Sequence, residues 1–225
     1  MATSGTTAFN LDFAEIIEEA AERCGYEIRS GNDVRTARRS LNLLFADWAN
    51  RGINLWTLEQ LSIPLASGTA TYDLPADTVD ITDAVVRTGT GSSQADLVIS
   101  RIAYPIYAAI PNKTTPGRPI QMWVERLATP RVTLWPVPDQ DTTYTLVYWR
   151  LRRIQDAGTG GNTQDLPFRF LPAMIAGLAY YLSMKLPGGF DRMGALKIQY
   201  DEAWLQASDE DREKAPVRLV PFQGY

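Results

Sequence analysis

The stretch that decides the fold is Phe168-Arg-Phe-Leu-Pro-Ala-Met-Ile-Ala-Gly-Leu-Ala-Tyr-Tyr-Leu-Ser-Met-Lys185. From Phe170 to Met184 nearly every side chain is apolar or small, and no charged residue interrupts the run. A surface helix would carry a polar stripe every three or four residues, and this stretch has none. It is also shorter than the roughly 20 residues that a membrane-spanning helix needs. The stretch therefore predicts a helix that is buried inside protein.

Three other segments show apolar residues at helical spacing and can surround this helix. The first is Asn10–Cys24, with Asn10 or Asp12 as its N-cap and Gly25 as its stop. The second follows Asn32-Asp33, and Gly52 closes it; its predicted apolar face is Val34, Ala37, Leu41, Leu44, Phe45 and Trp48. The third is Asp191–Ser208, with an apolar face of Met193, Leu196, Tyr200, Ala203, Trp204 and Ala207.

Between the second helix and the buried helix the period changes from helical to alternating. Short segments rich in β-branched and aromatic residues recur about every ten residues, with Gly and Pro between them. The predicted strands are Leu61–Leu65, Thr71–Leu74, Val79–Arg87, Asp96–Ile99, Ile120–Glu125, Arg131–Trp135 and Tyr144–Leu151. A short helix is predicted over Tyr104–Ala109, with Pro105 near its start.

This order predicts an α+β fold. N- and C-terminal helices form a bundle, an antiparallel β domain is inserted into it, and an extended tail ends the chain. The predicted boundaries are residues 9–60 and 165–208 for the two parts of the helical domain, 61–155 for the β domain and 209–225 for the tail.

Composition excludes several classes of function. The net charge of −4 and the pI near 5.0 argue against a general nucleic-acid binder. The single cysteine, Cys24, excludes an intramolecular disulfide framework, and its place in an amphipathic helix favours a core residue over a reactive thiol. No basic and apolar leader opens the chain, which argues against export through a signal peptide.

The sequence offers little catalytic chemistry, because it contains no histidine. The usual general base and the commonest zinc ligand are therefore missing. Asp209, Glu210, Asp211 and Glu213 lack the spacing of a calcium loop and are interpreted as a solvated helix end. The loops Gly89–Ser93 and Gly158–Gly161 lack the ending of a phosphate-binding loop. No metal, cofactor or catalytic residue is predicted.

Three features favour binding to other proteins. Five aromatic residues enrich the β region, most for its core and some for an interface: Trp123, Trp135, Tyr144, Tyr148 and Trp149. Arg150, Arg152 and Arg153 form a basic group, either a solvated strand end or a contact with an acidic neighbour. The segment Ala215–Tyr225 is apolar but is split by two prolines, so it suits an extended strand laid in a groove of another chain.

Six segments, in this order, carry a family resemblance: Gly52-Ile-Asn-Leu-Trp56, Tyr72-Asp-Leu-Pro-Ala-Asp77, Pro111-Asn-Lys-Thr-Thr-Pro-Gly-Arg-Pro119, Leu134-Trp-Pro-Val-Pro138, Leu166-Pro-Phe-Arg-Phe-Leu-Pro-Ala173 and Glu210-Asp-Arg-Glu-Lys-Ala215. From Leu11 to Pro221 the chain resembles head-to-tail adaptors of short-tailed bacteriophages, the tail tubular protein A and tail accessory factor family.

The resemblance implies a virion protein, assembled in the host cytoplasm, that forms a ring of twelve copies at the head–tail interface. The ring would join the portal protein to the tail nozzle protein and line the channel through which genomic DNA leaves without specific binding. No membrane contact is implied. The expected portal-binding residues are Arg212, Lys214, Val217, Arg218, Leu219, Val220, Phe222 and Tyr225. No nozzle-facing residues are assigned.

A second hypothesis is a tail-associated peptidoglycan hydrolase, since some similar proteins have been credited with that activity. Its candidate acids are the glutamates of the first helix, Glu15, Glu18, Glu19 and Glu22. Their place on the polar face of that helix favours simple contact with water, so we expect a protein without enzymatic activity.

Overall fold

The buried helix predicted from the sequence is present in the computed structural model as α4 (Leu171–Ser183), preceded by the 3₁₀-helix η3 (Phe168–Phe170). The structure describes residues 5, 11–52, 55–141, 143–159 and 161–212. The chain divides into a helical unit, Met1–Leu55 with Ile154–Tyr225, and a β unit, Trp56–Arg153. The β unit begins before residue 61 because its first strand starts at Leu58.

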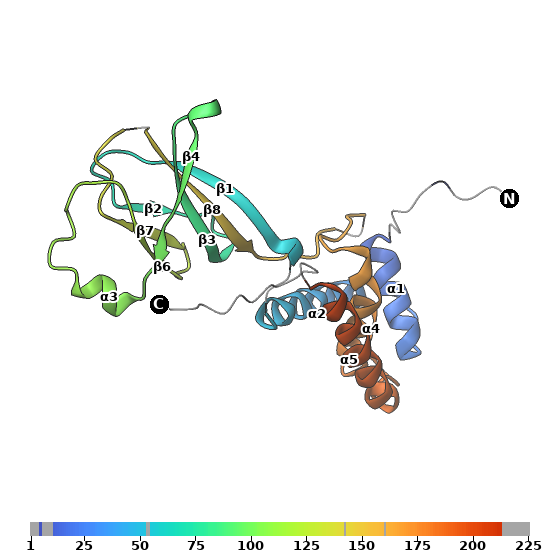
Figure 1. Ribbon diagram of the computed structural model, residues 1–225. Helices are drawn as coiled ribbons and strands as arrows, with labels where there is room; N and C mark the ends of the chain where they lie inside the picture. Colours follow the sequence, from blue (N-terminus) through green and yellow to red (C-terminus); the bar gives the residue numbers. More distant parts are fainter. Residues whose placement is uncertain (1–4, 6–10, 53–54, 142, 160, 213–225) are drawn as a thin grey trace, which may run out of the picture. The chain divides into compact units, whose positions relative to one another are not determined.

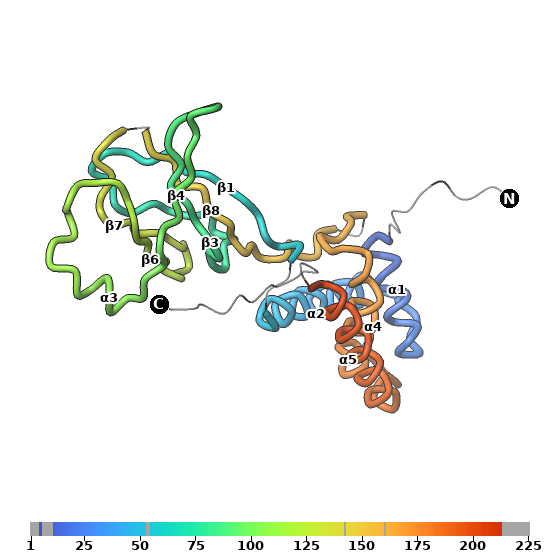
Figure 2. The backbone as a smooth tube through the Cα atoms, viewed as in Figure 1, coloured from blue at the N-terminus to red at the C-terminus, as the bar shows by residue number. Residues whose placement is uncertain are grey.

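The helical unit contains α1, α2, α4 and α5 (Figure 1). In addition to α4, these are α1 (Phe13–Cys24), α2 (Gly31–Asn50) and α5 (Met193–Glu210), with the 3₁₀-helix η4 (Phe190–Arg192) before α5. The tube in Figure 2 shows α4 between α1 and α5, and α4 packs against α1, α2 and α5. None of the described helices is both long and apolar enough to cross a membrane.

The apolar character of α4 is explained by this cover on several sides. Ten of its thirteen residues are buried: Leu171, Ala173, Met174, Ile175, Ala176, Gly177, Leu178, Ala179, Leu182 and Ser183. A β-carbon added at Gly177 would lie 2.9 Å from Cε2 of Tyr200 on α5 and 3.0 Å from both Cδ atoms of Leu44 on α2. Glycine at this position therefore allows two neighbouring helices to approach α4 closely.

Capping residues determine where α1 and α2 begin and where α1 ends. Asp12 caps α1 in a reciprocal capping box with Glu15, and Gly25 ends the helix with a left-handed φ of 76°. The second helix starts at Gly31, earlier than predicted, because Ser30 caps it in a box with Asp33. Val34, in the first turn of this helix, is exposed, so its assignment to the apolar face was wrong.

The β unit is built from two four-stranded sheets, in the orders β1-β8-β3-β4 and β2-β7-β6-β5. The strands are β1 (Leu58–Pro64), β2 (Thr71–Asp73), β3 (Thr78–Thr88), β4 (Ala95–Val98), β5 (Ser100–Arg101), β6 (Gln121–Glu125), β7 (Arg131–Trp135) and β8 (Tyr144–Arg152). The 3₁₀-helices η1 (Leu55–Thr57) and η2 (Gly91–Ser93) and the predicted helix α3 (Tyr104–Ala109) complete the elements. The pairing is antiparallel except between β5 and β6, which are parallel, so the expected antiparallel domain needs this correction.

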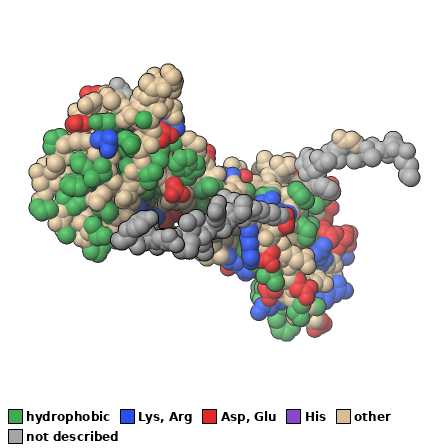
Figure 3. Space-filling model, in the orientation of Figure 1, with side chains coloured by type: hydrophobic (Ala, Val, Ile, Leu, Met, Phe, Trp, Pro, Cys, Tyr) green, Lys and Arg blue, Asp and Glu red, His purple; other side chains and the backbone are tan. Residues whose placement is uncertain are grey.

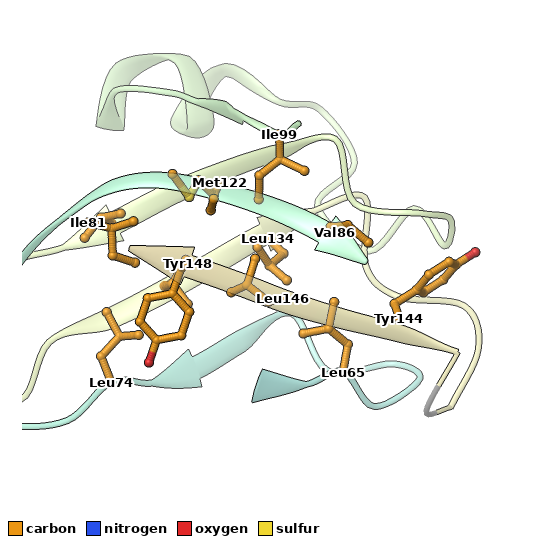
Figure 4. Packing of buried hydrophobic residues seen from close by; sticks show 13 residues of the cluster. Leu65, Leu74, Ile81, Val86, Ile99, Met122, Leu134, Tyr144, Leu146 and Tyr148 are labelled. Carbon is orange, nitrogen blue, oxygen red and sulfur yellow. The ribbon is translucent and has the colours of Figure 1, made fainter. Parts of the chain in front are cut away.

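One apolar core joins the two sheets. In Figure 4, Met122 and Leu134 of one sheet lie close to Ile81 and Leu146 of the other, and the four belong to one buried cluster. The side chains alternate along each strand, so each sheet buries one face against the other. A register shift between Ile81 and Asp83 interrupts this alternation in β3, where the pairing with β8 is irregular.

The close approach at Gly177 yields a stability prediction. Gly177→Ala should lower the free energy of unfolding of the helical unit by about 1 kcal/mol, because overpacking costs ~1–3 kcal/mol and the gain in helix propensity returns only ~1 kcal/mol. The measurement is urea unfolding followed by circular dichroism at a helix-sensitive wavelength. Gly194→Ala is the matched control: Gly194 also lies in a helix but faces open space, so this variant should be neutral or more stable. Equal effects at the two glycines would contradict the packing argument.

Candidate partner-binding surfaces

Of the expected portal-binding residues, only Arg212 lies in the described part of the chain. Its side chain is exposed and forms an ion pair with Asp209, one turn earlier. Lys214, Val217, Arg218, Leu219, Val220, Phe222 and Tyr225 lie outside the described residues. The structure therefore adds an accessible cation at Arg212 and leaves the rest of this set as a prediction.

The charged segment that begins at Asp209 is not wholly solvated as predicted. Helix α5 continues through Glu210, so residues 209 and 210 are not part of an extended tail. Asp211 is buried, accepts a hydrogen bond of 3.0 Å from the backbone N–H of Leu55, and pairs with the guanidinium of Arg169. A carboxylate with these partners joins three segments that are far apart in sequence.

A signal for the burial of Asp211 was present in the sequence. The buried residues of α5 are Leu196, Tyr200 and Ala207, and Asp211 continues their spacing by four more residues. Because residues four apart share a helix face, Asp211 lies on the side that packs against the protein. The charge of Asp211 alone predicted a solvent-exposed side chain, but its position on the packed face of the helix explains why it is buried.

In the β unit, Arg150 is the centre of a buried ionic cluster. It is 5% exposed and faces Glu59 directly across the β1–β8 pair. Its guanidinium donates to Glu59 Oε2 at 2.7 Å, to Asp77 Oδ1 at 2.6 Å and to the Thr78 hydroxyl at 2.8 Å. The hydrogen bond from Arg150 is the main cause that lowers the pKa of Asp77.

The two interpretations of the basic group 150–153 did not include this arrangement. For Arg150 the solvated interpretation is wrong, and the acidic neighbours belong to the same chain. The alternation of Tyr144, Leu146 and Tyr148 places Arg150 on the inner face of the strand, which is the signal that could have found it. Arg152 is half-buried and Arg153 is exposed, so Arg150 alone of this basic group is buried.

Beside α3 the β unit has an open pocket of about 390 Å³. It is lined by Arg101, Ile102, Ala103, Tyr104, Trp123 and Val124. Tyr107 stacks on Trp123 with the ring centroids 4.9 Å apart, and Arg101 pairs with Asp80 at 2.9 Å. This lining combines the rings of Tyr104 and Trp123 with the guanidinium of Arg101, and none of its residues is a carboxylate.

The five aromatic residues expected in the β region divide between core and margin. Tyr144 and Tyr148 are buried in the shared core of the two sheets, as expected for most of the set. The three tryptophans, Trp123, Trp135 and Trp149, are only half-buried. Of these, Trp123 contributes to the pocket beside α3 and is thus the member of the set closest to a candidate contact surface.

The candidate catalytic acids of α1 have structural contacts or face water. Glu15 closes the capping box, and Glu19 pairs with Arg23 at 2.9 Å, while Glu18 and Glu22 are exposed. Cys24 is buried and donates to the carbonyl oxygen of Ala179, and burial raises its pKa to about 11. Among the described residues, no group of three or more Cys, Asp or Glu side chains could hold a metal ion.

The two units differ in the kinds of side chain that are seen on one face of each. Figure 3 shows hydrophobic side chains gathered over the β unit, whereas acidic and basic side chains are interspersed over the helical unit. Large apolar side chains that remain exposed on the β unit are Leu58, Leu97, Val98, Tyr104, Ile106, Ile120 and Leu127, and the helical unit exposes others, among them Leu43, Ile198 and Leu205. Exposed apolar groups of this kind suit contacts with other proteins.

The chain thus folds as two compact units, and each exposes large apolar side chains. Residues 11–220 match the SU10 adaptor protein family, and the chain belongs to that family. The prediction of an adaptor protein from the sequence is thereby confirmed at the level of this family. The assignment to short-tailed phages stays a prediction.

Two further comparisons were made. Among solved structures, a chain from the neck of an empty GTA particle, computed with C6 symmetry, is similar to this chain at 11% identity and a TM-score of 0.27. That similarity covers 100% of this chain and 97% of the other. No curated protein matches the chain.

The Arg150 cluster predicts an asymmetric response to mutation. The double variant Glu59→Gln/Asp77→Asn leaves a buried guanidinium without charged partners and should cost about 3–5 kcal/mol. Arg150→Met should cost less, about 1–3 kcal/mol, because the carboxylates it leaves are 40% and 47% exposed and can be hydrated. Urea unfolding followed by tryptophan fluorescence measures both. Asp73→Asn, in an exposed pair with Arg131, is the control and should stay within about 0.5 kcal/mol.

The same cluster sets the expected pH dependence. Since the pKa of Asp77 is lowered in the folded chain, its contribution is complete above about pH 5 and is lost as the pH falls below about 4. The double variant should therefore show a weaker loss of stability than the wild type as the pH falls below about 4. A parallel loss in the two proteins would exclude Asp77 as a source of acid sensitivity.

The contact of Asp211 gives a second prediction for this region. Asp211→Ala should destabilise the helical unit by about 2–4 kcal/mol, because it leaves the Leu55 N–H and the half-buried Arg169 without their acceptor. Amide hydrogen exchange should show faster exchange at Leu55 in this variant than in the wild type. Asp209→Asn, at an exposed pair on the same helix, should change neither quantity, and loss of protection in both variants would contradict the assignment.

Proposed function

We propose that this chain is the structural head-to-tail adaptor of a short-tailed phage. Copies of it form a ring of twelve between the portal protein and the tail nozzle protein, and the ring lines the channel through which DNA leaves. The observation that carries this proposal is membership of the SU10 adaptor protein family over residues 11–220. The protein assembles in the host cytoplasm and remains in the virion at the head–tail interface.

The architecture supports a joining role. An adaptor has to present separate surfaces to partners on its two sides, and this chain folds as two compact units. Each unit has its own buried core, around α4 in one and between two sheets in the other. Each unit can therefore hold a contact surface in shape independently of the other.

The charge of the chain supports a channel wall rather than a DNA-binding surface. The net charge of −4 gives no general electrostatic attraction to phosphates. A wall that neutralised many phosphates would bind DNA tightly and in a salt-dependent manner. A weakly acidic ring lets DNA pass without specific binding.

The C-terminal segment is the proposed contact with the portal. Its residues in this role are Arg212, Lys214, Val217, Arg218, Leu219, Val220, Phe222 and Tyr225. The exposed position of Arg212, at the last described turn of the chain, is compatible with a contact that begins there. Extended segments bind grooves through their backbone and through alternating side chains.

Truncation tests this function. Removing Ala215–Tyr225 should leave circular dichroism unchanged and abolish co-sedimentation with rings of the portal protein encoded in the same genome, because the apolar docking segment is lost. Removing Met1–Ala8 is the matched control, since this stretch is small and polar, and it should leave portal binding unchanged. Co-sedimentation of the C-terminal truncation at the wild-type level would contradict the proposed contact. Failure of the full-length chain to bind portal rings would refute the adaptor function itself.

A further inference from the structure

The outward face of α2 carries positive charge. The exposed residues of this helix include Arg35, Arg38 and Arg39 and no acidic residue, which gives this exposed set a charge of +3. Arg35, Arg39, Leu43 and Ala46 follow each other at helical spacing on one side. Leu43 is 57% exposed. In the described part of the chain, neither Arg35 nor Arg39 has a carboxylate partner within 4.0 Å.

The outward face of α5 has the opposite charge. Its exposed residues include four acids and one cation, Lys197, so the set carries 1 − 4 = −3. The four acids are Asp201, Glu202, Asp209 and Glu210. Ile198 and Leu205, 61% and 59% exposed, lie two turns apart on one side, with Asp201 and Glu202 between them. Each face thus combines exposed apolar side chains with an excess of charge of one sign.

We propose that the outward face of α2 in one copy of this chain binds the outward face of α5 in the next copy. Leu43 and Ala46 of one copy contact Ile198 and Leu205 of its neighbour, and Arg35 and Arg39 pair with Asp201 and Glu202 around this apolar contact. This interface rests on the proposed ring function and assigns the surfaces that join its subunits.

Charge decides how the copies are arranged. A twofold contact centred on either face would place α2 against α2, or α5 against α5, and bring like charges together, whereas a reciprocal twofold contact of α2 with α5 needs both faces on one side of the molecule. A contact in which the α2 face of each copy binds the α5 face of the next brings opposite charges together and repeats from copy to copy in one direction. Such a head-to-tail contact closes into a ring when the rotation per copy permits, as an adaptor ring requires.

The other acidic helix is a poorer partner for α2. Helix α1 exposes Glu15, Glu18 and Glu22, but the large apolar residues in this helix, Phe13, Ile16 and Ile17, are buried. Exposed ion pairs alone contribute little to association. Among the described helices, only α5 offers both the negative charge and the exposed apolar side chains that the α2 face can cover.

Charge reversal of the full-length chain tests the interface. The first variant is Arg35→Glu/Arg39→Glu on α2, and the second is Asp201→Lys/Glu202→Lys on α5. The third combines all four changes and restores opposite charges. Glu18→Lys/Glu22→Lys on α1 is the matched control. Circular dichroism and thermal unfolding verify the fold of each variant, and sedimentation velocity at low ionic strength measures self-association of the purified chain.

Either single-face variant should weaken self-association by about 100-fold or more, the combined variant should recover it, and the α1 control should match the wild type. A monomeric wild type at the highest concentration, wild-type association of both single-face variants, or failure of the combined variant to recover would each overturn the interface. Binding of the same proteins to portal rings through the C-terminal segment is measured separately. If the wild type does not bind portal rings, the adaptor function is refuted. If the wild type binds portal rings and the single-face variants self-associate as the wild type does, only this interface is refuted.

Discussion

The helical unit depends on the burial of one helix from several directions. Helix α4 can be covered in this way because Gly177 presents no side chain to Leu44 and Tyr200. Near this close approach, the thiol of Cys24 on α1 donates a hydrogen bond to the carbonyl oxygen of Ala179, two residues after Gly177 on α4. The helices before and after the β unit thus form one core although the β unit separates them in sequence.

The polar groups inside this unit are placed where they support that packing. The indole N–H of Trp48 donates to the hydroxyl of Tyr200 at 2.9 Å, and the guanidinium of Arg51 lies over the rings of Tyr200 and Trp204. The ammonium of Lys185 donates to the hydroxyl of buried Ser40 at 2.8 Å. Polar groups satisfied in this way favour a single arrangement of the packed helices.

Helices and strands could be predicted well from the sequence because their periodicity is local. Phe170–Met184 lacks a polar stripe, and Tyr104–Ala109 has Pro105 in its first turn, and both became helices. Charged residues were the main source of error: Asp211 was assigned to solvent, and Arg150 to a solvated strand end or to a contact with an acidic neighbour, although both continue a buried periodicity. Their partners lie 73 and 91 residues away from Arg150, and 42 and 156 residues away from Asp211, so no local pattern could reveal them. Contacts between subunits are a property of assembled copies, and the sequence supplied only charge and exposure as guides.

The chain enters the β unit through β1 and leaves it through β8, and these two strands are neighbours in one sheet. Its first and last strands pair antiparallel, and Leu58 faces Leu151 across them. Paired residues in such strands have α-carbons only about 5 Å apart. A short loop could therefore span the gap left by removing the insertion, and a different domain with adjacent ends could be accommodated in its place. This arrangement makes the β unit a module that can be exchanged while the helical core around α4 is retained.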